Sequence, residues 1–416
     1  MIVNTRLTRR EFLKMTGLVT FAATVPQFLV ELARASTSRP IPGFRDDKVL
    51  VVVHLAGGND GLNTVVPYVD DAYYRARPTL GIKKENLLKI DDKTGFHASL
   101  APLKALYDKG LVTVVEGVGY PNPNRSHFRS TEIWYTASDS DVFRTTGWIG
   151  NYLDQAAASG VQPVAALAVS GERPQAFFGK RGLGVAVANP QRFGWQKGPG
   201  GATLDRFKAL NNPSSTSSDS VLEYIRHVAT DAVVSADIIA EVAKRGRSEA
   251  KYSADAFSSN MKTVAQLIGG DLPTRIFFLS FSGFDTHANQ APTQARLLEQ
   301  FASGMSAFWQ DMEAQGNASR VLVLVFSEFG RRVAENASGG TDHGTAEPVF
   351  LIGKGLRGGF AGKRPSLTDL DAGDLKFTTD FRSVYATILE AWLGTDSKKV
   401  MGRSFPRLPL FQNSQS

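Results

Sequence analysis

Acidic and histidine side chains follow an apolar stretch of the sequence in a pattern that suits a metal site. Asp285 and His287 come directly after the apolar run 276–281, and Asp342 and His343 repeat the pairing further along the chain. Carboxylate oxygens and imidazole nitrogens are ligands that proteins offer to divalent metals. The chemistry that this pattern predicts is metal-assisted hydrolysis.

Two further acids stand in equivalent places. Asp60 follows the first long apolar run of the chain, and Glu328 follows the run 321–326. Residues just after the strands of an open α/β sheet line its functional crevice, so both are candidate site residues. Two structural alternatives remain open. Asp60 lies in Gly-Gly-Asn-Asp-Gly and could be a turn residue, and Glu328 could form an ordinary ion pair with Arg331 or Arg332.

A polar segment in the first half of the chain has the features of an anion site. Residues 120–124 lead into Arg125, Ser126 and His127, where we expect a helix to begin. A helix N-terminus presents backbone N–H groups to an anion, and here a hydroxyl and an arginine stand beside them. The alternative for Ser126 is a plain capping role.

The first 35 residues predict an export signal. Residues 8–14 read Thr-Arg-Arg-Glu-Phe-Leu-Lys, similar to the twin-arginine consensus, and a weakly hydrophobic stretch follows. Ala33-Arg34-Ala35 offers small residues to a signal peptidase, so we expect cleavage before Ser36. The predicted partner is the twin-arginine translocation machinery, and the mature protein is expected in the periplasm or secreted. No later run reaches the roughly 18 apolar residues of a membrane span. An amphipathic N-terminal helix is the alternative.

Composition excludes several classes of protein. The chain is 42% hydrophobic and 21% charged and contains no cysteine. Disulfides, thiolate ligands and cysteine nucleophiles are therefore absent from its chemistry. The signal segment contains five basic and two acidic residues, so the net charge of +7 falls to about +4 in the mature chain. This mild, dispersed charge argues against a nucleic-acid partner.

Apolar runs alternate with amphipathic stretches, which predicts an α/β domain over residues 36–416 with a mostly parallel central sheet and helices on both faces. The expected strands are 49–55, 111–118, 164–169, 276–281, 321–326 and 349–352, the last closing the sheet, with a strand or hairpin at 177–188. The expected helices are 100–107, 130–135, 147–158, 221–245, 254–268, 292–315 and 381–392. Residues 170–270, loop-rich at 189–220, predict a cap insertion.

These motifs together resemble a known superfamily. The strand-end acid, the hydroxyl at a helix start, Asp285-Thr286-His287, Ser327-Glu328 and Thr341-Asp342-His343-Gly344 are similar to those of alkaline phosphatase-like enzymes. Within that superfamily the chain resembles the exported bacterial family of unknown function 1501, a relative of sulfatases. The resemblance extends over residues 46–410 and is most specific in its two C-terminal motifs.

The resemblance implies two divalent metals that clamp a phosphate or sulfate ester. It assigns Asp285, His287 and His343 to one metal and directs Asp60 and Glu328 toward the second. Ser126 becomes the candidate nucleophile, with Ser130 as the alternative. Arg125 becomes the candidate oxyanion partner, because a planar guanidinium suits tetrahedral anions.

The chain departs from the pattern at Phe329, where the superfamily has a histidine ligand. A second site would then hold mainly oxygen ligands, which suit magnesium, calcium or manganese better than zinc. His127, His54 or Asp342 could restore a ligand, and the sequence leaves both the identity of the metals and their number, one or two, open. Without cysteine, a cysteine-derived formylglycine cannot form, which favours phosphate over sulfate esters.

Three functions are consistent with this sequence. The first is an exported metal-dependent hydrolase of phosphate or related esters, acting on an anionic small molecule or polymer through Ser126. The second is a non-catalytic, metal-stabilised binding or surface protein. The third is a sulfatase that acts on polysaccharide with a water nucleophile.

Overall fold

The computed structural model describes residues 48–157, 165–180, 184–188 and 239–412. The predicted signal peptide and its cleavage position therefore lie outside the described residues, as does most of the predicted helix 221–245. Among the helices that the structure describes, none is both long and apolar enough to cross a bilayer.

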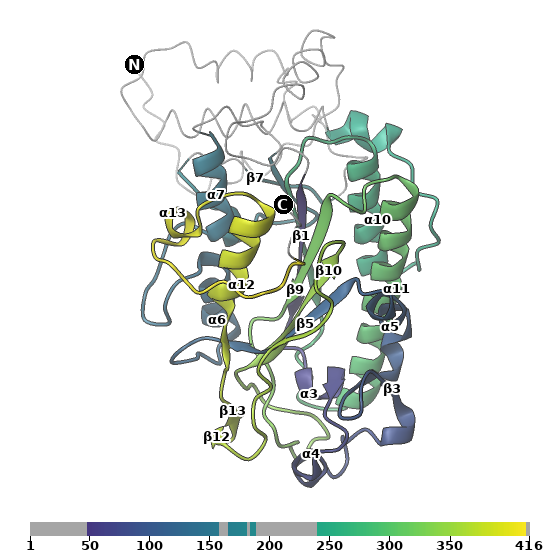
Figure 1. The fold of residues 1–416 in the computed structure, drawn as a ribbon, viewed down its shortest axis with the longest axis vertical. Coiled ribbons are helices and arrows are strands. Elements are labelled where there is room, and N and C mark those ends of the chain that lie inside the picture. Colours follow the sequence, from purple (N-terminus) through teal and green to yellow (C-terminus); the bar gives the residue numbers. More distant parts are fainter. Residues whose placement is uncertain (1–47, 158–164, 181–183, 189–238, 413–416) are drawn as a thin grey trace, which may run out of the picture.

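A nine-stranded sheet forms the centre of the molecule (Figure 1). Its order is β11 (Gly359–Gly362), β5 (Val112–Gly119), β10 (Glu347–Gly353), β9 (Val321–Phe326), β1 (Val49–Ala56), β8 (Ile276–Ser282), β6 (Ala166–Ala168) and β7 (Gly184–Ala186), with β14 (Thr379–Asp380) beside β5. All pairings are parallel except those of β10, which runs against both β5 and β9. The apolar runs form strands because both of their faces are buried.

Helices cover the two faces of the sheet (Figure 1). Alternate residues of β1 face the two sides. Val49, Val51 and Val53 face a core shared with α5 (Ala101–Asp108), α10 (Ala256–Gly269) and α11 (Gln290–Ala314). Leu50 and Val52 face the opposite core, which contains residues of α6 (His127–Thr136), α7 (Trp148–Ala157), α12 (Phe381–Thr387), the π-helix Ile388–Trp392 and α13 (Ser397–Met401). The predicted α/β architecture is confirmed.

Smaller elements lie around this core. They are the antiparallel strands β2 (Val65–Val66), β4 (Gly95–His97) and β3 (Leu87–Lys89), the pair β12 (Leu370–Asp371) and β13 (Asp374–Leu375), and the short helices α3 (Gly61–Thr64) and α4 (Asp71–Ala76). Short 3₁₀ turns occupy Lys84–Asn86, Ala98–Leu100 and Gln175–Phe177. Together α3 and α4 position the segment that follows β1.

Two predictions about the elements need correction. The sheet does not end at β10, because β11 and β14 add to β5 beyond it; both are short and lack the apolar run of a central strand. The expected strand 177–188 is reduced to β7, a parallel strand beside β6. The helix that contains the expected segment 130–135 begins at His127, where a helix start was predicted. Most of the predicted cap 170–270 lies outside the described residues, so the cap stays a prediction.

Candidate metal centre

The site lies at one edge of the sheet because of the strand directions. Strands β9, β1 and β8 are neighbours and parallel, so the loops that follow them start at the same edge. Strand β5 has the same direction and leads to α6, while β10 runs the opposite way, so the loop before it reaches this edge too. Five loops therefore meet where parallel strands end, the usual place for a site in an open α/β sheet.

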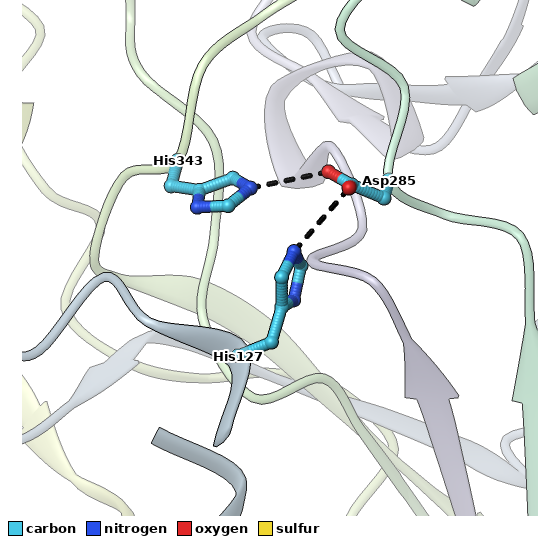
Figure 2. Close-up of side chains that lie close together, drawn as sticks. All are labelled: His127, Asp285 and His343. Carbon is cyan, nitrogen blue, oxygen red and sulfur yellow. Dashed lines mark hydrogen bonds and ion pairs between the residues drawn. The ribbon is translucent and has the colours of Figure 1, made fainter. Parts of the chain in front are cut away.

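Three of these loops bring His127, Asp285 and His343 together (Figure 2). One ligand atom from each residue lies within 4.8 Å of the other two. The two carboxylate oxygens of Asp285 divide the contacts: Oδ1 lies 3.1 Å from Nε2 of His343, and Oδ2 lies 3.3 Å from Nε2 of His127. His127 is the first residue of α6, and Asp285 comes from the loop after β8.

His287 adds a third imidazole to the same place. Its Nε2 atom lies 3.0 Å from Oδ1 of Asp285 and 2.9 Å from Nε2 of His343. The structure thus brings Asp285, His287 and His343 together, the set that the resemblance assigns to one metal, and adds His127 to them.

The far nitrogen of each ring is held by a fixed acceptor. Nδ1 of His343 lies 2.8 Å from the carbonyl oxygen of Arg125, which can only accept, so this nitrogen carries the proton. Nδ1 of His287 lies 3.1 Å from Asp342, whose carboxylate also holds Asn336. A neutral ring that donates from Nδ1 keeps its lone pair on Nε2, the arrangement found in histidines that bind metals.

Glu328 performs the same task for His127. Its Oε1 lies 2.7 Å from Nδ1 of His127, and its Oε2 lies 3.0 Å from Nε2 of His54. The backbone N–H of Gly57 donates to the same carboxylate. The side chain of Glu328 is buried, so its carboxylate is committed to these donors and orients His127 from behind.

The lone pairs in the cluster show what would fit it. Nε2 of His127 is buried and makes no hydrogen bond in the described part of the chain. Nε2 of His287 and Nε2 of His343 face one another at 2.9 Å, and two lone pairs at that separation repel unless a cation or proton lies between them. Three imidazole nitrogens and one carboxylate are a suitable ligand set for a divalent metal.

The charges and hydrogen bonds of the cluster lower the pKa of its carboxyl groups and raise the pKa of His127. Burial alone would raise the pKa of Asp285, but the hydrogen bond and the positive charge of Arg331 outweigh it and hold that pKa at about 2. Burial likewise works against the Glu328 carboxylate, and the hydrogen bonds from His127 and His54 lower its pKa. The hydrogen bond to Glu328 raises the pKa of His127, which makes its ring a stronger base.

Asp60 lies outside this cluster. Its carboxylate is 2.5 Å from the guanidinium of Arg77 and accepts a hydrogen bond of 2.5 Å from the side-chain amide of Gln290. The same side chain caps α3 by accepting from the N–H groups of Leu62 and Asn63. Asp60 is buried. Its contacts with Arg77 and Gln290 connect the end of β1 with α4 and α11.

Arg331 and Phe329 form the floor of the site. The buried guanidinium of Arg331 donates to Asp285 at 2.7 Å and to the carbonyl oxygens of Gly58 and Thr341. It is therefore a fixed positive charge beside Oδ1 of Asp285, the same oxygen that His287 and His343 approach. The buried ring of Phe329 lies 5.0 Å from the ring of His127 and 4.6 Å from that of His343.

The segment before α6 contains the predicted anion site. Ser126 is the N-cap residue of α6. It is exposed, and its hydroxyl makes no capping hydrogen bond. Arg125, whose carbonyl oxygen holds His343, forms an ion pair with Asp374. Ser130 is buried and bonded to the Tyr120 hydroxyl at 2.7 Å, so it has no access to a substrate.

Sequence reasoning named several functional residues only as possibilities. His127, His54 and Asp342 were three open candidates for a missing ligand, and they prove to have different positions. His127 joins the cluster, whereas His54 contacts Glu328 behind it and Asp342 holds the ring of His287. The available signal for His127 was its place at the start of a helix, beside Ser126. The position of Arg331 had no signal beyond its nearness to Glu328.

Residues 118–407 match the family model described as "Protein of unknown function (DUF1501)". No curated protein matches the chain significantly. Similar solved structures include the C-terminal periplasmic domain of EcEptC from Escherichia coli in complex with Zn, at 9% identity over 76% of this chain and 75% of that chain, with a TM-score of 0.38. A protein of the alkaline phosphatase superfamily from Vibrio parahaemolyticus has 11% identity, covers 92% and 79%, and has a TM-score of 0.37. The lipoteichoic acid synthase LtaP from Listeria monocytogenes has 8% identity, covers 78% and 71%, and has a TM-score of 0.33. Likeness at this level carries no argument about activity.

Proposed function

Because this chain belongs to the DUF1501 family, described only as proteins of unknown function, we propose its function from the site: an exported, metal-dependent hydrolase of phosphate or related esters. The observation that carries the proposal is the cluster of three imidazole Nε2 atoms around the carboxylate of Asp285. Export is supported by the twin-arginine motif in residues 8–14.

We assign one divalent metal to His127, Asp285, His287 and His343. Three nitrogen ligands and one oxygen ligand favour zinc or a similar transition metal over magnesium or calcium. A second metal held by Asp60 and Glu328 has less support, because both carboxylates already bind protein donors.

A bound metal of this kind supplies Lewis acidity, which polarises a phosphoryl oxygen and neutralises developing charge. The residues of the chain provide position and charge. Glu328, Asp342 and the carbonyl oxygen of Arg125 hold the three imidazoles with their Nε2 atoms directed inward. Arg331 holds Asp285 deprotonated at neutral pH. Since these partners are already in place, little reorganisation is needed when an anionic ester binds.

Ser126 remains the proposed nucleophile. Its two neighbours in the sequence both belong to the site: the carbonyl oxygen of Arg125 contacts His343, and His127 is in the cluster. The hydroxyl is exposed and makes no capping bond. The attack would form a bond from the serine oxygen to phosphorus and break the bond to the ester oxygen, which leaves as the alcohol with the serine proton. Water would then cleave the phosphoserine, release phosphate and restore the hydroxyl. Arg125 stays the proposed partner of the substrate anion, since its side chain is 40% exposed although it pairs with Asp374.

One observation favours a second candidate function. Four protein ligands would complete a tetrahedral coordination shell, which is the usual arrangement in structural zinc sites. A non-catalytic, metal-stabilised binding protein therefore stays a candidate beside the hydrolase. Asp285 and His287 argue against a purely structural site, because their side chains are 47% and 44% exposed and structural metals are usually enclosed.

The test is turnover of an aryl phosphate and of an aryl sulfate by zinc-loaded protein. The proposal expects phosphate hydrolysis that is lost in Ser126→Ala and retained in Ser140→Ala, a control serine in the loop after α6. Hydrolysis of the sulfate alone would favour the polysaccharide sulfatase. Tight zinc binding without turnover of either ester would contradict the hydrolase and favour the binding protein.

A further inference from the structure

We propose that His54 is a positioning residue of the metal centre, acting through Glu328 on His127. His54 lies near the carboxyl end of β1, and its side chain is only 3% exposed. It does not reach the cluster itself. This inference rests on the proposed function, because it assumes that His127 binds the metal.

Hydrogen bonds connect His54 to the site without a break. Nε2 of His54 lies 3.0 Å from Oε2 of Glu328, and Oε1 of Glu328 lies 2.7 Å from Nδ1 of His127. On the other side, Nδ1 of His54 lies 2.9 Å from the hydroxyl of Tyr135. The chain of groups therefore runs from Tyr135 through His54 and Glu328 to His127.

The direction of each hydrogen bond follows from the chemistry of its partners. A carboxylate can only accept, so His54 donates from Nε2 and His127 donates from Nδ1, and Glu328 serves both. A neutral His54 then accepts at Nδ1 from the hydroxyl of Tyr135. Burial raises the pKa of that hydroxyl, so it keeps the proton that it donates. These directions leave the lone pair of His127 on Nε2, the atom that lies in the cluster.

Packing holds the ring of His54 in this orientation. The ring stacks on Phe326 with centroids 4.9 Å apart and an angle of 6° between planes, and it meets Tyr135 edge to face at 5.5 Å. Rotation of the ring would break both contacts and both hydrogen bonds. Glu328 is thus held at its Oε2 atom by a rigid donor, and its Oε1 atom is left to orient His127.

Groups behind the ligands of a metal commonly change its affinity by 10 to 100-fold. Removal of the imidazole from His54 leaves Oε2 of Glu328 with only two longer contacts, from the N–H of Gly57 at 3.2 Å and from the Ser327 hydroxyl at 3.3 Å, so its carboxylate can turn. We therefore expect the zinc affinity of His54→Phe to fall by about tenfold or more. His54→Gln, whose amide can donate to Glu328, is expected to recover part of the loss.

The experiment measures the zinc affinity of the full mature chain by competition with a coloured chelator. His97→Gln is the matched control, because His97 caps a 3₁₀ turn through Ser99 and contacts none of the groups named above. Nitrogen NMR of the metal-free protein adds a second readout, the position of the proton on His127. The proposal expects that proton on Nδ1 in the wild type and a mixed population in His54→Phe.

The outcomes are distinct. If the wild type binds no zinc, the proposed function fails first. If the wild type binds zinc and a folded His54→Phe binds it within twofold with unchanged His127 signals, the positioning role is overturned. Should His54→Phe not fold, Tyr135→Phe removes only the hydroxyl at the start of the chain of groups. It is expected to weaken zinc binding by about twofold to tenfold, and equal affinity would overturn the role.

Discussion

Asp60→Asn distinguishes a structural carboxylate from a metal ligand. In the structure Asp60 is buried against Arg77 at 2.5 Å and accepts from Gln290. The asparagine keeps the size of the side chain and removes its charge. Arg77, which also donates to the carbonyl oxygens of Val333 and Arg332, would then be a buried cation without its counterion.

The size of the effect follows from that burial. Both side chains of the pair are at most 1% exposed, and removal of one partner from a buried ion pair costs about 3–5 kcal/mol. With a urea m-value of about 3 kcal/mol per M, the unfolding midpoint should fall by roughly 1 to 1.7 M. The exposed Asp92→Asn is the control and should change stability by less than about 0.5 kcal/mol.

Urea unfolding of the metal-free protein and metal content after dialysis are the two measurements. We expect Asp60→Asn to lose stability and to retain its metal. A variant that kept its urea midpoint and lost metal would refute this reasoning and make Asp60 a ligand. Arg77→Gln and the double variant complete the cycle, and the two single losses should not add, because the residues share one interaction.

Three further predictions concern the site. Ser126→Ala should lower kcat on an aryl phosphate by about 10³-fold or more. Ser130→Ala should mainly destabilise the fold, by about 1–3 kcal/mol, since it leaves buried partners without a hydrogen bond. Steady-state kinetics and urea unfolding distinguish the two effects. A chelator should lower the melting temperature, with a loss of about 4 kcal/mol if zinc had been present at a thousand times its Kd; equal melting curves with and without chelator would refute it. Because Asp285 has its pKa lowered from 3.8 to about 2, it adds stability to the metal-free protein above its unfolded pKa, and that stability is lost as pH falls through the folded value. Between about pH 4 and 2 the wild type should therefore lose more stability than Asp285→Asn in acid titrations followed by circular dichroism.

The sequence was a good guide to the parts of the fold with strong local signals. Strands β1, β8 and β9 are mostly apolar, because a central parallel strand is buried on both faces. Strands β11 and β14 were missed, since each is short and pairs only at the edge of the sheet. Their pairing depends on β5, which lies far away in the chain.

The site residues, too, were predictable only where the sequence carries a local pattern. Asp285, His287 and His343 carry a local signal, because ligand types follow a strand or repeat within a short motif. Asp60 carries the same signal, yet its carboxylate is paired with Arg77 and Gln290, and no spacing in the sequence announces those long-range contacts. The roles of the acids behind the histidines depend likewise on contacts between distant loops.

We propose that His127, Asp285, His287 and His343 hold one divalent metal. The most direct test is metal content by inductively coupled plasma mass spectrometry, on natively exported protein and on an Asp285→Ala/His343→Ala variant. We predict close to one metal per chain in the wild type and none in the variant. No metal in the wild type, or equal metal in the variant, would contradict the claim, and two metals per chain would restore a second site near Asp60 and Glu328.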